Sequence, residues 1–223
     1  MSELIEAAKA GDRPRVKQLL SDRAAAGTRA DSGESALIAA LYRGHREIAN
    51  DIADAQVAAG DPLDVFAAAA LGRDDQLTGA LADPAAVGAF AFDGWTALHL
   101  AAFFGHLDAT TRLLEAGASL AAVSRNPLTN TPLHAAVAGG HVEVALFLIA
   151  RGADVDAVDA GQHTPLHIAA EAGYLPVVEA LLARGANPHA VDVEDKTPLS
   201  RAAARNHTAV VDAINLSEGK GSA

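Results

Sequence analysis

A four-residue motif, Thr-Pro-Leu-His, recurs along this chain at nearly constant spacing. It occurs at residues 131–134 and 164–167, and the near copy Thr-Ala-Leu-His occurs at residues 96–99. A glycine recurs in the same register at positions 11, 44, 72, 105, 140 and 173, and asparagine replaces it at 206. A period of about 33 residues indicates a tandem array, in which each short unit is stable only when packed on its neighbours.

Each unit carries the signals of two short helices. A Ser or Thr stands where it can cap the first helix, and Pro132, Pro165 and Pro198 follow at the first helical position, where a missing N–H costs nothing. The second helix carries paired aliphatic residues before a Gly-Ala stop, as at residues 148–153. Helices of two to three turns do not persist alone in water, so packing between units must stabilise them.

The Thr-Pro-Leu-His-x-Ala core and its period resemble the ankyrin-repeat family. The resemblance is strongest over residues 96–199 and weakest over 55–89. It implies an all-α solenoid of about seven helix-turn-helix units joined by projecting β-hairpin fingers. We expect a single ankyrin-repeat domain at residues 1–216 and a flexible C-terminal tail at 217–223. The units are expected at about residues 1–30, 31–60, 61–90, 91–124, 125–158, 159–191 and 192–216.

Two of the steps between the recurring glycines depart from the regular period of about 33 residues. A step of 28 residues shortens the link at 56–63 and predicts a plain turn in place of a finger. A step of 35 residues predicts a longer finger at 124–130. The third unit also has Leu63 and Asp64 where Thr and Pro are expected, so its first helix should begin less sharply. We therefore expect the third unit to be the weakest part of the array.

Charge and residue usage argue against several classes of function. The net charge is -11, from 17 Lys plus Arg against 28 Asp plus Glu. This charge repels a phosphate backbone, so we expect no nucleic-acid partner. The absence of cysteine removes disulfides and Cys-ligated metal sites. The chain begins without a basic n-region or an apolar h-region, so we expect a cytoplasmic location and no membrane association.

Nine histidines invite comparison with a metal or catalytic site. His99, His134 and His167 fall at the third position of their helices, where a side chain can reach back to the cap. In the ankyrin family this His is structural and ties its turn to the adjacent repeat. Equivalent positions in stacked units lie about 8–10 Å apart, too far to share a metal ion. We predict that the protein is not an enzyme and has no catalytic, cofactor-binding or metal-binding residues, because no such motif is present.

Five of the nine aromatic residues gather near the middle of the chain, at Phe90, Phe92, Trp95, Phe103 and Phe104. In the ankyrin family, the positions before the repeat Thr lie on the finger, and the two before the closing Gly face the concave side. Large aromatic residues among polar neighbours are typical of a binding hot spot. The alternative is that Phe90 and one of Phe103 or Phe104 fill space left by the irregular third unit.

These patterns favour a non-catalytic scaffold that binds a protein partner through its concave face and fingers. The rival is a structural protein that self-associates through the Phe/Trp patch, and an enzyme ranks third. Acidic residues near the fingers are either solvated faces or a patch that steers a basic partner. We thus expect a monomer with a basic or amphipathic protein partner. The predicted partner-binding residues are Tyr42, Arg43, Leu71, Phe90, Phe92, Trp95, Phe103, Phe104 and Arg125.

Overall fold

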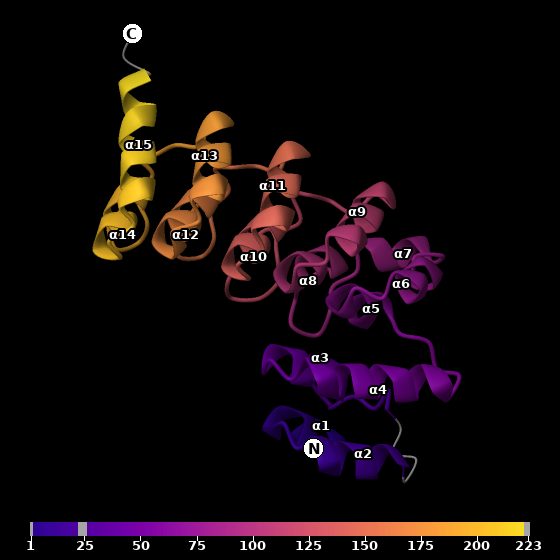
Figure 1. Cartoon of the computed structure of the whole chain (residues 1–223). Coiled ribbons are helices and arrows are strands. Elements are labelled where there is room, and N and C mark those ends of the chain that lie inside the picture. Colours follow the sequence, from indigo (N-terminus) through magenta and orange to yellow (C-terminus); the bar gives the residue numbers. More distant parts are fainter. Residues whose placement is uncertain (1, 22–25, 221–223) are drawn as a thin grey trace.

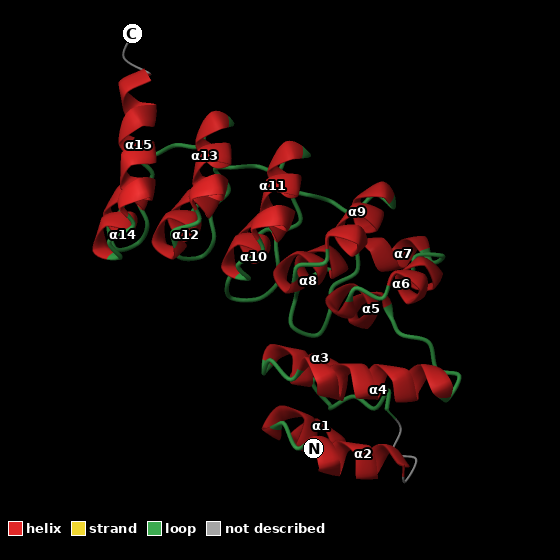
Figure 2. Cartoon of the chain, in the orientation of Figure 1, coloured by secondary structure: helices red, strands yellow, loops and turns green. Residues whose placement is uncertain are grey.

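The computed structural model describes residues 2–21 and 26–220, which form fifteen helices and no named strand (Figures 1 and 2). An all-α repeat fold is therefore confirmed. The helices are α1 (Glu3–Ala10), α2 (Arg13–Ser21), α3 (Ala36–Tyr42), α4 (Arg46–Ala58), α5 (Val65–Leu71), α6 (Asp74–Ala80), α7 (Pro84–Val87), α8 (Ala97–Phe104), α9 (Leu107–Glu115), α10 (Pro132–Ala138), α11 (Val142–Ala150), α12 (Pro165–Ala172), α13 (Leu175–Ala183), α14 (Pro198–Ala204) and α15 (Thr208–Lys220).

The helices lie in consecutive pairs, from α1 with α2 to α14 with α15, and the short α7 follows the third pair. Each pair packs beside the next in chain order, so the two ends of the chain lie at opposite ends of an elongated array (Figure 1). The first helices of neighbouring pairs pack on one another, as do most of the second helices. The stability of each pair thus depends mainly on its immediate neighbours.

Side-chain caps begin the first helix of every pair after the first, whereas the Ser2 side chain makes no capping hydrogen bond to α1. Thr96, Thr131 and Thr164 each accept a hydrogen bond from the N–H of the His three residues later. The prediction that the first helix of the third unit begins less sharply is wrong. The Asp64 carboxylate caps α5 by accepting a hydrogen bond from the N–H of Ala67 at 2.8 Å. A carboxylate satisfies the free N–H groups of a helix start as a hydroxyl does.

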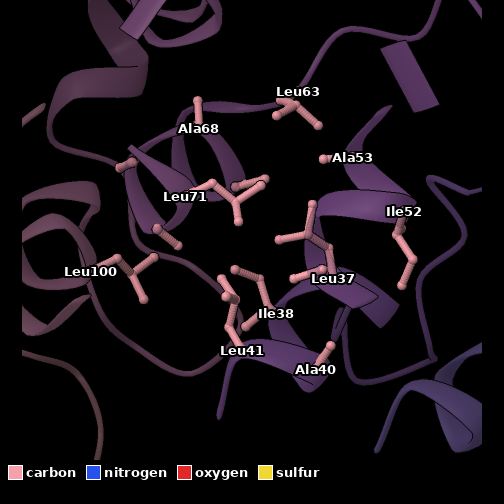
Figure 3. Packing of buried hydrophobic residues seen from close by; sticks show 14 of the residues in the cluster. Leu37, Ile38, Ala40, Leu41, Ile52, Ala53, Leu63, Ala68, Leu71 and Leu100 are labelled. Carbon is pink, nitrogen blue, oxygen red and sulfur yellow. The ribbon is translucent and has the colours of Figure 1, made fainter. Parts of the chain in front are cut away.

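Aliphatic and small side chains fill the space between the pairs. In the N-terminal half, Leu37, Ile38 and Leu41 of α3 pack in one cluster with Leu71 and Leu100 (Figure 3). Buried alanine pairs recur in the first helices at 39–40, 68–69, 101–102, 135–136 and 169–170. Their small side chains let neighbouring helices approach closely and pack densely.

Tight links, here called fingers, connect most pairs. In each finger the N–H of the first residue donates to the carbonyl of the last, at 2.7–3.1 Å. The expected β-hairpins are not confirmed, because the described residues contain only isolated antiparallel bridges, Arg29 with Ser35 and Phe90 with Thr96. The fingers are residues 30–34, 91–95, 124–130, 159–163 and 192–196.

Neighbouring fingers in the C-terminal half are also joined to each other. The N–H of the second residue of a finger donates to a carbonyl of the preceding one. These bonds join Arg125 to Gly94, Ala160 to Leu128 and Val193 to Gly161, at 2.8, 2.9 and 3.1 Å. The longer finger at 124–130 and the plain turn before α5 agree with the two irregular steps in the sequence.

The contact between the second and third pairs is the least extensive among successive first helices. Ile38 and Ala67 occupy the helix position that carries a bridging His in α8, α10 and α12. Gly44, which follows the first helix of the second pair, has no side chain against it, whereas the His141 ring covers the equivalent Gly105. Several of the interactions that support the array elsewhere are therefore missing here.

The C-terminal helix is longer than the sequence indicated. We expected a flexible tail from residue 217, but α15 continues to Lys220, and residues 221–223 lie outside the described residues. The helix can continue because residues 215–220 contain no proline, and Ile214 anchors the preceding turn in the core.

We expect amide hydrogen exchange to be about tenfold faster across residues 56–87 than across 131–183, because each missing hydrogen bond removes about 1 kcal/mol of local stability. Gly79, near the end of α6, weakens the same segment. Exchange monitored by mass spectrometry under native conditions measures the difference, and uniform protection of both segments would contradict it.

Candidate partner-binding surface

Four aromatic side chains from three parts of the fold meet in one cluster, which we call the aromatic cluster. Tyr42 ends α3, Trp95 lies on a finger, and Phe103 and Phe104 end α8. The Trp95 and Phe103 ring centroids are 5.0 Å apart, and those of Tyr42 and Phe104 are 5.8 Å apart. Several of these pairs meet edge to face, a favourable arrangement for aromatic rings.

A hydrogen bond holds Tyr42 in this cluster. Its hydroxyl donates to the carboxylate of Asp93 on the finger at 91–95. Partial burial of the ring and the bond to Asp93 both raise the pKa of Tyr42, so the hydroxyl stays protonated at neutral pH and remains a donor. The cluster is therefore held in place before any partner arrives.

The exposed part of the cluster is smaller than the sequence predicted. Tyr42 is 39% exposed, and Phe103 and Phe104 are partly buried. Trp95 and Leu71 are only 6% and 7% exposed. These last two residues are part of the interior and offer little surface to a partner.

A second group of predicted residues lies on the neighbouring fingers. The Arg125 guanidinium stands over the Phe90 ring, 3.8 Å from its centroid, in a cation–π contact. Phe92, 39% exposed, lies against Gly33 at the tip of the preceding finger. Arg43 is exposed beside Tyr42. Tyr42, Arg43, Phe92 and Arg125 thus offer the most surface among the predicted residues.

The missing finger of the third pair leaves a cavity of about 220 Å³. Fingers 30–34 and 91–95 flank it, and Ile38, Phe66 and Leu100 contribute to its apolar lining. Arg29 and Asp64 form an ion pair beside it. Phe90, which the alternative interpretation placed in the space left by the irregular third unit, lines this cavity.

Sequence reasoning missed a set of exposed aliphatic residues on the fingers or directly before them. They are Val123, Leu128, Val158, Val191 and Val193, all 44–66% exposed. Their position in the repeat could have identified three of them, because Val123, Val158 and Val191 each directly precede the first residue of a finger. Their exposure could not be read from the sequence, where an aliphatic residue usually indicates core.

The three equivalent histidines are structural, as predicted. In each, Nδ1 lies 2.8–2.9 Å from the Oγ1 of its Thr cap, and Nε2 lies 3.0 Å from a carbonyl of the next repeat. With Nδ1 accepting from the Thr, Nε2 carries the proton and donates to that carbonyl. The carbonyls belong to Asn130, His163 and Lys196 for His99, His134 and His167 respectively.

Burial keeps these imidazoles neutral. It lowers the pKa of His99 to about 4, against the bond to Asn130, which raises it, and burial also lowers the pKa of His134 and His167. Burial is also the main cause that lowers the pKa values of His106 and His141, which occupy the N-cap positions of α9 and α11. A proton added to any of these rings would create a poorly solvated charge.

Charged side chains form a network at the C-terminal end of the array. Arg201 contacts the buried carboxylate of Asp192 at 2.5 Å and that of Glu171 at 3.3 Å, and Arg205 contacts Glu171 at 2.7 Å. Burial alone would raise the pKa of Asp192, but hydrogen bonds from the Lys196 N–H and Arg201 lower it to about 2. The network connects the last finger to α14, and these charged groups pair with one another within the protein.

Among residues 2–21 and 26–220, no group of three or more His, Asp or Glu side chains is arranged to hold a metal ion. No helix in the same residues combines the length and hydropathy needed to cross a bilayer.

Stacked helix pairs with capped first helices define a helical repeat protein. Residues 65–159 match the model of three ankyrin repeats, and residues 161–193 match that of a single ankyrin repeat. The chain belongs to the ankyrin-repeat family, whose repeats generally mediate protein–protein interaction. Over 102 residues, 45% of this chain, it is 38% identical to a probable E3 ubiquitin-protein ligase, XBOS31, of Oryza sativa subsp. japonica. The matched segment is 22% of that protein, so the chain spans less than a quarter of its length.

We expect stability to fall as the pH is lowered from 7 to 5. The unfolded state takes up protons near the ordinary His pKa of about 6.5, whereas folded His99 does so only near 4. The stability that neutral His99 contributes is thus present above pH 6.5 and is lost as the pH falls towards 4, by about 2 kcal/mol at pH 5. Thermal melts followed by circular dichroism at pH 7, 6 and 5 measure this loss.

The matched variant is His99→Gln, which should cost about 1 kcal/mol at pH 7 but flatten the pH dependence. Asp192 titrates near pH 2 and does not contribute in this window. A variant with the same pH dependence as the parent protein would show that His99 is not buried in the neutral form.

Proposed function

We propose that this protein is a non-catalytic scaffold that binds a protein partner through the aromatic cluster and the fingers beside it. In this proposal each of the seven helix pairs is one ankyrin unit and the fingers are its projecting hairpins. The observation that carries the proposal is the partly exposed set Tyr42, Phe103 and Phe104, supported from beneath by buried Trp95. Aromatic anchors surrounded by polar residues are typical of interface hot spots.

Preorganisation supplies the mechanism. The Tyr42 hydroxyl is already bonded to Asp93, and the four rings already pack on one another. Because these side chains are already ordered in the free protein, little further conformational entropy is lost when a partner docks here. The surface is rigid because stacked neighbours, rather than local contacts within one pair, determine its shape.

The rice relative bears on this proposal only through the shared segment. That protein is named as a probable ubiquitin ligase, but the segment in common is 22% of its length. Ankyrin repeats recognise proteins in many settings, so we propose that recognition, rather than ligation, is what the two proteins share. A basic or amphipathic partner suits the net charge of -11.

We expect Tyr42→Ala and Phe104→Ala each to weaken partner binding about 30-fold, because truncating a hot-spot side chain costs about 2 kcal/mol or more. The partner is isolated by affinity purification from the source cell, and its dissociation constant is then measured by calorimetry. Val57→Ala is the matched control, since Val57 on α4 is also 39% exposed but lies outside the cluster.

Trp95→Ala separates surface from interior. It should lower the melting temperature strongly, because removing a buried aromatic costs about 3–5 kcal/mol. Light scattering tests the rival function: a mass that rises with concentration and falls in Phe104→Ala would indicate self-association through the cluster. Equal partner binding by Tyr42→Ala, Phe104→Ala and Val57→Ala would refute the proposed surface.

A further inference from the structure

Three exposed valines occupy the same place on successive fingers. Val123, Val158 and Val191 directly precede the first residue of their fingers and are 49%, 44% and 53% exposed. Phe90 holds the equivalent place before the finger at 91–95. The fingers close with equivalent hydrogen bonds and are bonded to one another. Val123, Val158 and Val191 therefore form a row along the array, which we call the valine row.

The spacing of the valine row follows from the packing of the helix pairs. Packed helices lie about 8–10 Å apart, so the equivalent residues before successive fingers recur at about this spacing. A ligand that contacts every valine must present an apolar group at this period.

A polyproline II segment has the required period. It turns once in three residues and rises about 3.1 Å per residue, so every third side chain returns to the same face after about 9.3 Å. A β-strand covers a similar distance in three residues, but its side chains alternate, and the first and fourth point to opposite faces. The valine row therefore matches a polyproline II segment better than a strand.

Charge around the row determines the remaining chemistry of the ligand. The links that carry Val158 and Val191, residues 153–163 and 186–197, expose four carboxylates and a single Lys or Arg side chain, that of Lys196. The carboxylates are Asp154, Asp156, Glu194 and Asp195, of which Glu194 also contacts Arg201 at 3.3 Å. A complementary ligand carries basic residues between its apolar ones.

We propose that the valine row binds an extended, polyproline II segment of a partner protein, with an apolar residue at every third position and basic residues between. The inference rests on the proposed protein-binding function and adds the location and the ligand chemistry. The apolar side chains of the bound segment contact Val123, Val158 and Val191, and its basic side chains face the exposed carboxylates.

The probe is a fluorescein-labelled peptide with four copies of Leu-Pro-Lys, titrated with the full chain and followed by anisotropy. The matched peptide has the same composition, with leucines at every second position and the lysines gathered at one end. We expect the three-residue period to bind at least tenfold more tightly at 0.15 M salt. Equal affinities would mean that charge alone attracts the peptides, which would overturn the proposal, as would no measurable binding of either.

Val158→Thr and Val191→Thr test the row itself, because threonine keeps the branched shape and replaces one of the two methyl groups with a hydroxyl. Each should weaken binding of the three-residue peptide about fourfold, and the double variant about 15-fold, given about 0.8 kcal/mol per buried methyl group. Val57→Thr, on the outer helix α4, is the control and should bind as the parent does. Melting curves confirm that each variant is folded.

Failure of this inference is separable from failure of the proposed function. If the natural partner loses affinity in Phe104→Ala but Val158→Thr changes no affinity for peptide or partner, the aromatic cluster is the binding surface and the valine row is not. If light scattering shows that the row joins two copies of this chain, with Val158→Thr dissociating them, a foreign segment is not its ligand.

Discussion

Hydrogen bonds from buried histidines to the next repeat connect the units of the C-terminal half. His99, His134 and His167 each accept from a Thr cap at one ring nitrogen and donate to a neighbouring carbonyl at the other. One side chain thus stabilises a helix start and a contact between repeats at the same time. The series ends at Ser200, whose hydroxyl bonds only within its own turn, where no further pair follows in the described chain.

The irregular third pair links stability to function. Without a finger or a bridging His there, the second and third pairs meet over a smaller area. The same omission brings fingers 30–34 and 91–95 together at Phe92 and opens the cavity beneath them. Tyr42 can then reach across to Asp93 and Phe104. A weak contact in the array and a preformed aromatic surface therefore have one structural origin.

Much of this was visible in the sequence, and the errors have identifiable causes. The caps at Thr96, Thr131 and Thr164 and the role of the histidines follow from local chemistry that recurs in every regular unit. Burial of Trp95 and Leu71 was missed because a residue's position in the repeat cannot distinguish an outward side chain from one that faces the core. The exposed valines were missed because one residue type serves both core and surface.

The sequence by itself determined the repeat, its period, the helix starts and the positions where the pattern breaks. These depend on contacts between residues a few positions apart, such as a Thr with the His three residues later. Only the tertiary structure decided which aromatic rings meet, which of them stay exposed, and that Val123, Val158 and Val191 form one row. Such properties depend on how successive pairs stack, because they involve residues such as Tyr42 and Phe104, or Val158 and Val191, which are more than thirty positions apart and become neighbours only when the array is assembled.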